Sequence, residues 1–385
     1  MSASLPRESN ARAKAPLRQP LHARLRELLH WRVNRDQHFW LIGVLAVTLL
    51  AVTIIALGVG PVVIEPLQVV AIALNSVGVT SAQELVTTFT PQQEAVLLSI
   101  RAPRVALGIL VGAGLAVAGA TLQGLFRNPL ADPTLIGVSS GAAFSAVAVI
   151  VLGSTVLSGL TDVLGSATLP VAAFAGGVVT TIIVFRIGTR AGYTDAATVL
   201  LAGIAINAIA SAGIGLLTYI ADDEQLRTLT FWTMGSLGGT TWSRFSGAAP
   251  FILLAIVLVP LYARALNALL LGEAETRHLG FDLQPLKRHL ILLVAMAVGA
   301  SVAVTGIIGF IGLVVPHLLR LIVGPDYRSL LPGAMLLGAV LLLAADLVSR
   351  TIVAPAELPI GIITSVIGGP FFIWLLMRRN KRVFL

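Results

Sequence analysis

Residues 306–320 read GIIGFIGLVVPHLLR, an apolar segment with glycines at positions 306, 309 and 312. The glycines recur at helical spacing, and Pro316 and His317 then interrupt the apolar run. In a membrane protein, an interrupted and glycine-lined segment is typical of an element that moves or lines a pore. We therefore predict such a role for this segment, in preference to that of an inert anchor.

The composition around this segment is that of a membrane protein. Hydrophobic residues make up 56% of the 385 residues and charged residues only 11%, whereas a soluble domain has about 25% charged residues. Apolar runs of about 18 residues or more recur, and each is long enough to cross a bilayer. The fold class predicted is an all-α polytopic membrane protein with about ten transmembrane helices.

Ten apolar runs define the predicted spans, with 1–38 as a basic N-terminal segment and 39–385 as the transmembrane domain. Apolar positions recur at a helical period over 17–35, which indicates a helix lying along the inner membrane surface; a disordered tail is the alternative for 1–16. The ten spans are 39–59, 104–123, 135–153, 168–187, 196–220, 247–268, 289–305, 307–323, 333–352 and 360–377.

The distribution of Lys and Arg predicts the orientation. If both termini are cytoplasmic, 21 of the 26 Lys and Arg residues lie on the cytoplasmic side, as the positive-inside rule requires. This rule explains the net charge of +8 better than a nucleic-acid partner does. The N-terminus is not a secretory signal, because its basic residues are spread over 35 residues before the first apolar run.

The chain has no sequence signature of catalysis or of metal binding. Its three lysines follow Ala, Leu and Asn, so none belongs to a Walker A loop. The six histidines are scattered, there is no cysteine, and no carboxylate pair lies near a base in an apolar context. We predict no catalytic residue, no metal site and no cofactor in this chain; if transport uses ATP, a separate subunit hydrolyses it.

Two cytoplasmic loops are candidate functional elements. Residues 271–288 read LGEAETRHLGFDLQPLKR, and their charges followed by Leu279-Gly280 predict a short helix with a glycine stop. We interpret this helix as the docking site of a cytoplasmic partner, with a solvated loop as the alternative. Residues 126–137 contain two Xaa-Pro pairs that disfavour helix, so they form either a structured loop at an inner gate or a simple connector.

Charged residues on the outer side also need an explanation. Arg101, Arg104 and Arg350 lie where the positive-inside rule leaves few charges, and docking of an acidic partner or attraction of an anionic substrate would explain them. Snorkelling to lipid headgroups is the alternative. Asp346 lies four residues before Arg350, so a structural charge pair is expected in preference to substrate contact.

Five segments together resemble the permease subunits of ABC importers for vitamin B12, ferric siderophores and heme. They cover almost everything after residue 100, and only their combination is specific. The segments are RAPRVALGILVGAGLAVAGATLQGLFRNPLADPTLIGVSSGAA (101–143), LLAGIAINAI (200–209), LGEAETRHLGFDL (271–283), GIIGFIGLVVPHLLR (306–320) and ADLVSRTIVAPAELPIGIITSVIGGPFFIWLL (345–376).

The resemblance implies a type II importer in the bacterial inner membrane. Such permeases have ten helices per subunit and form homodimers with the pathway along the two-fold axis. Two cytoplasmic ATPase subunits, which bind ATP and Mg, would dock on the segment similar to the family's coupling helix. A periplasmic binding protein would meet the outer arginines (101, 104 and 350). The coupling residues implied are Glu273, Glu275, Thr276, Arg277, His278, Leu279 and Gly280.

The resemblance also implies an inner gate at the turn before the fifth span. In the B12 permease this turn carries small hydroxyl residues, whereas this chain has alanine at two of the positions. The gate and pathway candidates are Asn128, Asp195, Ala196, Ala197, Thr198 and Asn207.

The predicted cargo depends on one further similarity. Residues 230–237, TFWTMGSL, are similar to a stretch that heme importer permeases carry, so heme is favoured over a ferric siderophore and over cobalamin. The alternative from another class is a proton-driven secondary carrier with Asp346 as its intramembrane acid, and a passive channel or structural subunit is a third. Copurification of an ATPase would distinguish the ATP-driven importer from the proton-driven carrier and from the channel or structural subunit.

Overall fold

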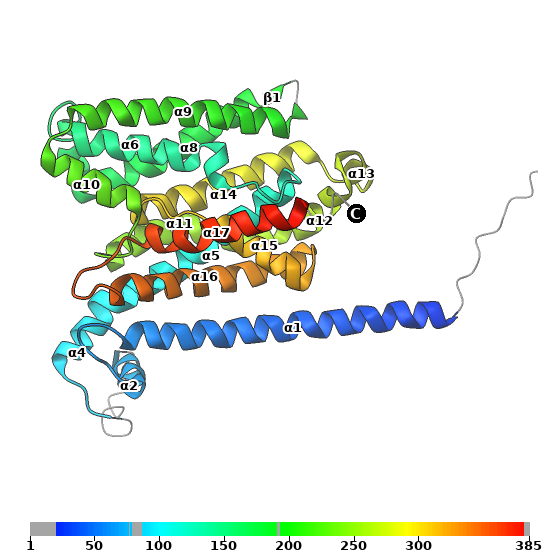
Figure 1. The fold of residues 1–385 in the computed structure, drawn as a ribbon, viewed down its shortest axis with the longest axis horizontal. Helices are drawn as coiled ribbons and strands as arrows, with labels where there is room; N and C mark the ends of the chain where they lie inside the picture. Colours follow the sequence, from blue (N-terminus) through cyan, green and yellow to red (C-terminus); the bar gives the residue numbers. More distant parts are fainter. Residues whose placement is uncertain (1–20, 77, 79–86, 191–192, 381–385) are drawn as a thin grey trace, which may run out of the picture. The chain divides into compact units, whose positions relative to one another are not determined.

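The computed structural model describes residues 21–76, 78, 87–190 and 193–380 (Figure 1). Internal contacts divide the chain into Met1–Leu41 and Ile42–Leu385. The first helix runs without a break over Leu21–Gly58, so the helical period predicted for the basic segment continues directly into the first span. Residues 1–20 lie outside the described part, and the placement of the segment on the membrane surface stays a prediction.

The described chain is almost entirely helical, with one two-stranded antiparallel pair. Residues 97–101 form a π-helical turn that joins α4 to α5, and the strands pair Thr189 with Thr194. The elements are α1 (Leu21–Gly58), α2 (Pro66–Ser76), α4 (Pro91–Val96), α5 (Ala102–Leu125), α6 (Val138–Leu152), α7 (Ser158–Leu164), α8 (Thr168–Ile187), β1 (Thr189–Arg190), β2 (Tyr193–Thr194), α9 (Ala196–Ile220), α10 (Asp223–Met234), α11 (Trp242–Leu258), α12 (Ala263–Leu271), α13 (Glu273–His278), α14 (Leu283–Thr305), α15 (Ile311–Val323), α16 (Tyr327–Thr351) and α17 (Ile360–Asn380).

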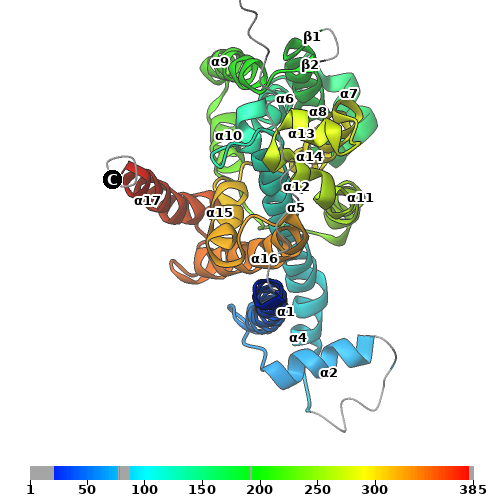
Figure 2. The ribbon, with the colours of Figure 1, turned by 90° about the vertical axis from the view of Figure 1, so that its right-hand side faces the viewer.

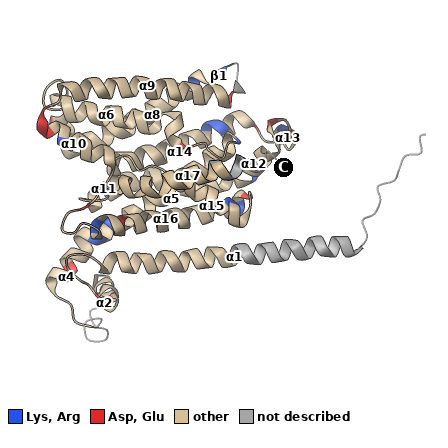
Figure 3. Cartoon of the chain, in the orientation of Figure 1, with Lys and Arg blue, Asp and Glu red and all other residues tan. Residues whose placement is uncertain are grey.

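The predicted all-α polytopic fold is confirmed. Every predicted span contains a helix, and the fourth and fifth coincide with α8 and α9. Seven helical stretches of the described chain are long and apolar enough to cross a membrane, and α6, α15 and α17 are shorter apolar helices. Within residues 42–380, charged residues lie mostly near the helix ends and leave apolar lengths between them (Figure 3), which is the distribution a bilayer imposes.

Pro316 and His317 interrupt the apolar run of the sequence but do not break the helix, in agreement with the predicted span 307–323. The helix is broken earlier, at Gly306–Phe310, where Gly306 and Phe310 both have positive φ, and α15 then continues through Pro316. Proline removes the N–H that would bond the carbonyl four residues before it, which here belongs to Gly312. Gln123 of α5 donates its Nε2 to that carbonyl over 3.3 Å, so the freed acceptor is satisfied and the helix persists.

Helix α5 is the centre of the described core. It packs against α11, α12, α14, α15 and α16 (Figure 2), and nearly all its side chains are buried. Glycines allow the closest of these contacts: a Cβ on Gly338 of α16 would lie 2.6 Å from the Cβ of Ala116 in α5. Small residues on both sides therefore let the two helix backbones approach, as is usual in membranes.

A second group of helices lies beside this core. Helices α6, α8 and α9 pack on one another, and α14 joins α8 to α11 (Figure 1). The outward face of α9 is apolar and exposed, as at Leu201 (66%) and Ile209 (66%). Exposed apolar surface of this extent marks contact with lipid or with another protein.

Candidate functional site

The segment predicted to couple to a cytoplasmic partner forms the short helix α13. It begins after Gly272, has acidic residues in its first turn and basic residues in its last, which complements the helix dipole. Gly280 has a φ of +87° just beyond the helix, so the predicted helix with a glycine stop is confirmed. Thr276 is fully buried and donates its hydroxyl to the Gly272 carbonyl over 2.6 Å.

Lys287 connects this helix to the second strand. The buried ammonium of this α14 residue donates to Glu273 Oε1 over 2.7 Å and to the Thr194 carbonyl over 3.0 Å. A buried charge is tolerated only when it is paired and hydrogen-bonded, and these two acceptors meet that requirement. Lys287 therefore binds the first residue of α13 and the residue that precedes the predicted gate turn.

The predicted gate turn forms the N-terminus of α9. Asp195 caps the helix, because its Oδ2 accepts from the Thr198 backbone N–H at 2.8 Å and from the Thr198 hydroxyl at 2.5 Å. These hydrogen bonds lower the pKa of Asp195, so the carboxylate is charged at neutral pH. Ala196 and Ala197 occupy the first turn of the helix.

The other two gate candidates lie in different environments. Asn207 in α9 donates its Nδ2 to the Thr134 carbonyl over 3.0 Å and accepts from the Ser140 hydroxyl over 2.5 Å, so it fastens the segment before α6 to α9. The side chain of Asn128 accepts from the Leu130 N–H within its own turn. No described hydrogen bond joins Asn128 to α9, and the gate role of these residues stays a prediction.

Asp132 is a partly buried acid of the same connector. Its Oδ1 accepts from the Thr134 N–H at 2.9 Å and caps the short 3-10 helix Pro133–Ile136. Burial raises the pKa of Asp132. The loop between α5 and α6 is therefore internally structured, which fits the interpretation as a shaped element better than that as a simple connector.

Arg104 lies at the opposite end of α5 in a buried charge cluster. Its Nε and Nη2 donate to Asp346 Oδ1 over 3.0 and 2.9 Å, and its Nη1 donates to Glu357 Oε1 over 2.8 Å. Arg104 is 7% exposed and Asp346 is 0% exposed. Two forked pairs of this kind are among the strongest polar contacts that a guanidinium makes.

The remaining two arginines bind backbone near the end of α1. Arg101 donates to the carbonyls of Leu57 and Gly58, each over 2.7 Å, and to that of Val62. Arg350 donates to the Ala56 carbonyl, and its Nε lies 3.8 Å from Asp346 Oδ2, which is the charge pair expected from their spacing. Carbonyls at a helix end have no intrahelical donor, so these arginines complete the hydrogen bonding there.

The three arginines predicted to dock a binding protein therefore all donate hydrogen bonds within the subunit, and of these donors Nε of Arg350 is buried without a hydrogen-bond partner. Arg101 is only 4% exposed, and Arg350 has a side chain that is 7% exposed. The docking role is untested and stays a prediction. The contacts support an intramolecular role instead, in which the arginines join α1, α5, α16 and the segment before α17.

Glu357 makes this cluster sensitive to acid. The hydrogen bond from Arg104 lowers the pKa of this loop carboxyl below its ordinary value of 4.5. A carboxyl group whose pKa is lowered by folding stabilises the folded protein at pH values above its pKa in the unfolded chain. This stabilisation is lost as the pH falls through the pKa of the group in the folded protein. We expect the melting temperature of wild type to exceed that of Glu357→Gln by a constant amount above about pH 5 and by less at each lower pH. Thermal unfolding of both proteins in detergent measures the difference, and a constant gap down to pH 3 would contradict the assignment.

A second polar network was not anticipated from the sequence. Arg320 of α15 donates to Gln123 and, over 3.2 Å, to the Tyr327 hydroxyl, which in turn donates to the Ala120 carbonyl over 3.2 Å. Asn267 of α12 accepts from the Tyr327 N–H at 2.9 Å. The available signal was Gln123, a polar side chain within an apolar span.

Among the described residues, no group of three His, Asp or Glu side chains is placed to hold a metal ion.

The helices and their internal polar contacts define a polytopic helical membrane protein. The chain belongs to the FecCD transport family, whose model matches residues 48–378. It is 50% identical to the hemin transport system permease protein of Yersinia pestis over 74% of this chain and 84% of that protein.

Two further comparisons agree with the family. The cobalamin import system permease protein of Halobacterium salinarum is 43% identical over 75% of each chain. A solved structure described as an inward-facing conformation of a putative metal-chelate type ABC transporter is 33% identical, with a TM-score of 0.74 over 88% of this chain and 98% of that one. The likeness thus extends from sequence to fold.

Proposed function

We propose that this chain is the permease subunit of an ATP-driven importer that moves heme from the periplasm to the cytoplasm by alternating access in a homodimer. The observation that carries the proposal is the 50% identity to a hemin permease over most of both chains. The cobalamin relative at 43% identity supports the same importer class with another cargo, so cobalamin and ferric siderophores are the alternatives.

ATP and Mg belong to a separate subunit in this proposal. The full sequence holds no Walker A loop, and α13 is the element on which two cytoplasmic ATPase subunits dock. A periplasmic binding protein delivers the cargo at the opposite end, and both termini are cytoplasmic. The excess of Lys and Arg on that side supports this orientation.

Movement passes from α13 to the inner gate through Lys287. A displacement of α13 acts on the ion pair with Glu273, and the same ammonium binds the Thr194 carbonyl directly before Asp195 and α9. ATP binding shifts the balance between inward-open and outward-open states only if the ATPase binds the two states with different affinity. The contacts of Lys287 connect α13 to the α9 N-terminus, so this difference in affinity can change the conformation of the gate.

A proton-driven carrier is less well supported by the geometry. Its indispensable acid would be Asp346, and this carboxylate has Arg104 against both oxygens and Arg350 beside it. The carboxylate oxygens are thus held by hydrogen bonds from a neighbouring guanidinium within the subunit. Asp346 therefore acts as a structural counter-ion in this proposal, and it carries no proton across the membrane.

The test of the proposed function is uptake by proteoliposomes that hold this chain and its ATPase. We expect heme delivered by a loaded binding protein to accumulate only with ATP and Mg, and not with an ATPase variant that lacks the Walker A lysine. A ferric siderophore or cobalamin delivered in the same way measures cargo preference. Accumulation driven by a proton gradient without ATP would overturn the proposed mechanism, and uptake of cobalamin alone would overturn the cargo.

A further inference from the structure

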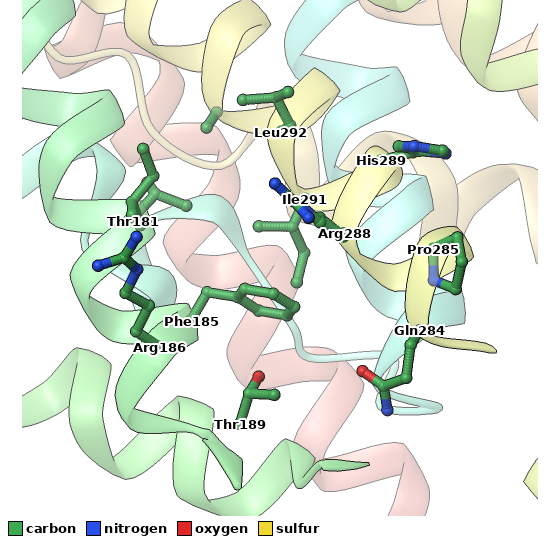
Figure 4. A pocket seen from close by; sticks show the side chains of 12 residues that line it. Thr181, Phe185, Arg186, Thr189, Gln284, Pro285, Arg288, His289, Ile291 and Leu292 are labelled. Atoms are coloured by element: carbon green, nitrogen blue, oxygen red, sulfur yellow. The ribbon is translucent and has the colours of Figure 1, made fainter. Parts of the chain in front are cut away.

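A groove of about 830 Å³ lies between the C-terminal half of α8 and the N-terminal half of α14 (Figure 4). Pockets of roughly 300–1,000 Å³ are of the size that holds small ligands. The groove has apolar walls and a polar rim. Its lining includes Thr181, Ile182, Phe185, Arg186, Arg288 and Leu292.

Two guanidinium groups supply the charge of this α8–α14 groove. Arg186 lies on the α8 wall and Arg288 reaches from the α14 wall, with the ring of Phe185 extending between the helices (Figure 4). Both arginines are exposed, no ion pair of the described residues involves either of them, and the lining contains no acidic residue. The groove therefore offers two cationic donors to an anion.

The apolar surface beside the arginines continues along α8. Ile182 is 43% exposed, Ile183 is 43% exposed and Val179 is 55% exposed, all within a helix long and apolar enough to cross a membrane. On α14, Leu292 is 44% exposed on the opposite wall. The groove thus has positive charge at the end of the spans and exposed hydrocarbon leading away from it.

We propose that the α8–α14 groove binds an anionic glycerophospholipid. Its phosphate lies between Arg186 and Arg288, which can each donate two hydrogen bonds to phosphate oxygens, and an acyl chain follows Ile182 and Val179 along α8. Basic pockets between transmembrane helices bind anionic headgroups by this chemistry. The groove adjoins Gln284, whose Oε1 accepts from the Thr194 hydroxyl over 3.3 Å, so the lipid lies next to the predicted gate turn.

A lipid fits this groove better than a soluble anion or a protein segment. A soluble anion would use the two arginines and leave the exposed α8 face without a role. An acidic protein segment would have to place its backbone against apolar side chains in a transmembrane helix, where unpaired backbone groups are costly. Only an amphipathic anion uses both the charge and the adjoining apolar surface.

The test is native mass spectrometry of the purified full chain in neutral detergent, titrated with phosphatidylglycerol or phosphatidylcholine. We expect wild type to retain phosphatidylglycerol in preference to phosphatidylcholine, and Arg186→Gln/Arg288→Gln to bind it about tenfold more weakly. The matched control is Arg264→Gln/Arg328→Gln, which removes two exposed arginines outside the groove and should bind as wild type does. Equal phosphatidylglycerol binding by wild type and by the groove variant would overturn the proposal.

Two further measurements keep the lipid assignment falsifiable. Ile182→Asn should weaken phosphatidylglycerol binding several-fold while leaving the melting temperature in neutral detergent unchanged, and unaltered lipid binding would overturn the acyl-chain placement. Glycerol 3-phosphate in millimolar excess should not displace the lipid, and full displacement would assign the groove to a soluble phosphate instead. If Arg186→Gln/Arg288→Gln changed the number of protomers measured by size exclusion but left phosphatidylglycerol binding unchanged, the groove would be a contact between subunits and the lipid proposal would be overturned.

Discussion

Replacing Arg104 by methionine is expected to destabilise the protein by about 3–5 kcal/mol, because the change leaves a buried charge without its partner. Asp346 has no exposed surface, and it would lose the donors on Nε and Nη2 that lie 2.9–3.2 Å from its oxygens. Glu357 would lose its partner as well, but it is partly exposed and water can replace the lost bonds. Thermal unfolding in detergent and the yield of monodisperse protein measure the effect.

The same variant separates the structural role of Arg104 from a docking role. A docking arginine predicts a normal melting temperature, an intact complex with the ATPase and weaker affinity for the binding protein. The control is Arg244→Met, since Arg244 is exposed and its described hydrogen bond is made by its backbone N–H. If Arg104→Met melted within a degree of Arg244→Met, the buried cluster would contribute little to the stability of the fold.

A double variant tests where the loss comes from. Replacing both members of a buried pair by apolar side chains costs much less than removing one member. Arg104→Met/Asp346→Leu should therefore recover much of the stability lost in Arg104→Met, although Arg350 would then lack its 3.8 Å neighbour. No recovery would mean that Arg104 stabilises the fold through Glu357 alone.

The sequence predicted local structure better than distant contacts. The bounds of α8 and α9 follow from apolar runs alone, and the end of α13 follows from Gly280, because these signals act within one element. The pairing of Asp346 with Arg350 also follows from helical spacing. Arg104, in contrast, is 242 residues away from Asp346 in the sequence, and no local pattern brings the two together.

The interruption of the glycine-rich segment shows the same limit. Proline predicts a helix break from sequence because it removes a donor. Here α15 continues through Pro316, and Gln123, on another helix, donates to the carbonyl of Gly312 that the proline leaves without a donor. Such compensation depends on tertiary packing, so a sequence reading of one segment cannot include it.

The contact on which the proposed coupling depends is also one between distant residues. Thr194 lies 93 residues before Lys287, and the sequence alone placed Lys287 among the charges of a cytoplasmic loop. The side chain is buried because it bridges two separate elements. Its position between α13 and the α9 N-terminus is what makes a mechanical role testable.

Replacing Lys287 by methionine is expected to lower ATP-driven uptake about tenfold or more, within the range of free energies that couple distant sites, while the ATPase subunits stay bound and hydrolyse ATP. The fold should persist, with a stability loss of about 1–2 kcal/mol, because Glu273 is 36% exposed on its side chain and can be hydrated. The measurement is the ratio of cargo transported to ATP hydrolysed in proteoliposomes. A purely structural role would lower the melting temperature and leave that ratio unchanged.

A matched control and a double-mutant cycle complete the argument. Arg264→Met removes an exposed positive charge from α12, and its transport ratio should equal that of wild type. Glu273→Gln should lower the ratio in the same direction as Lys287→Met, and the double variant should be no worse than Lys287→Met, since contacting residues in one path are non-additive. If the two losses were additive, α13 would reach the gate by a route that does not include this ion pair.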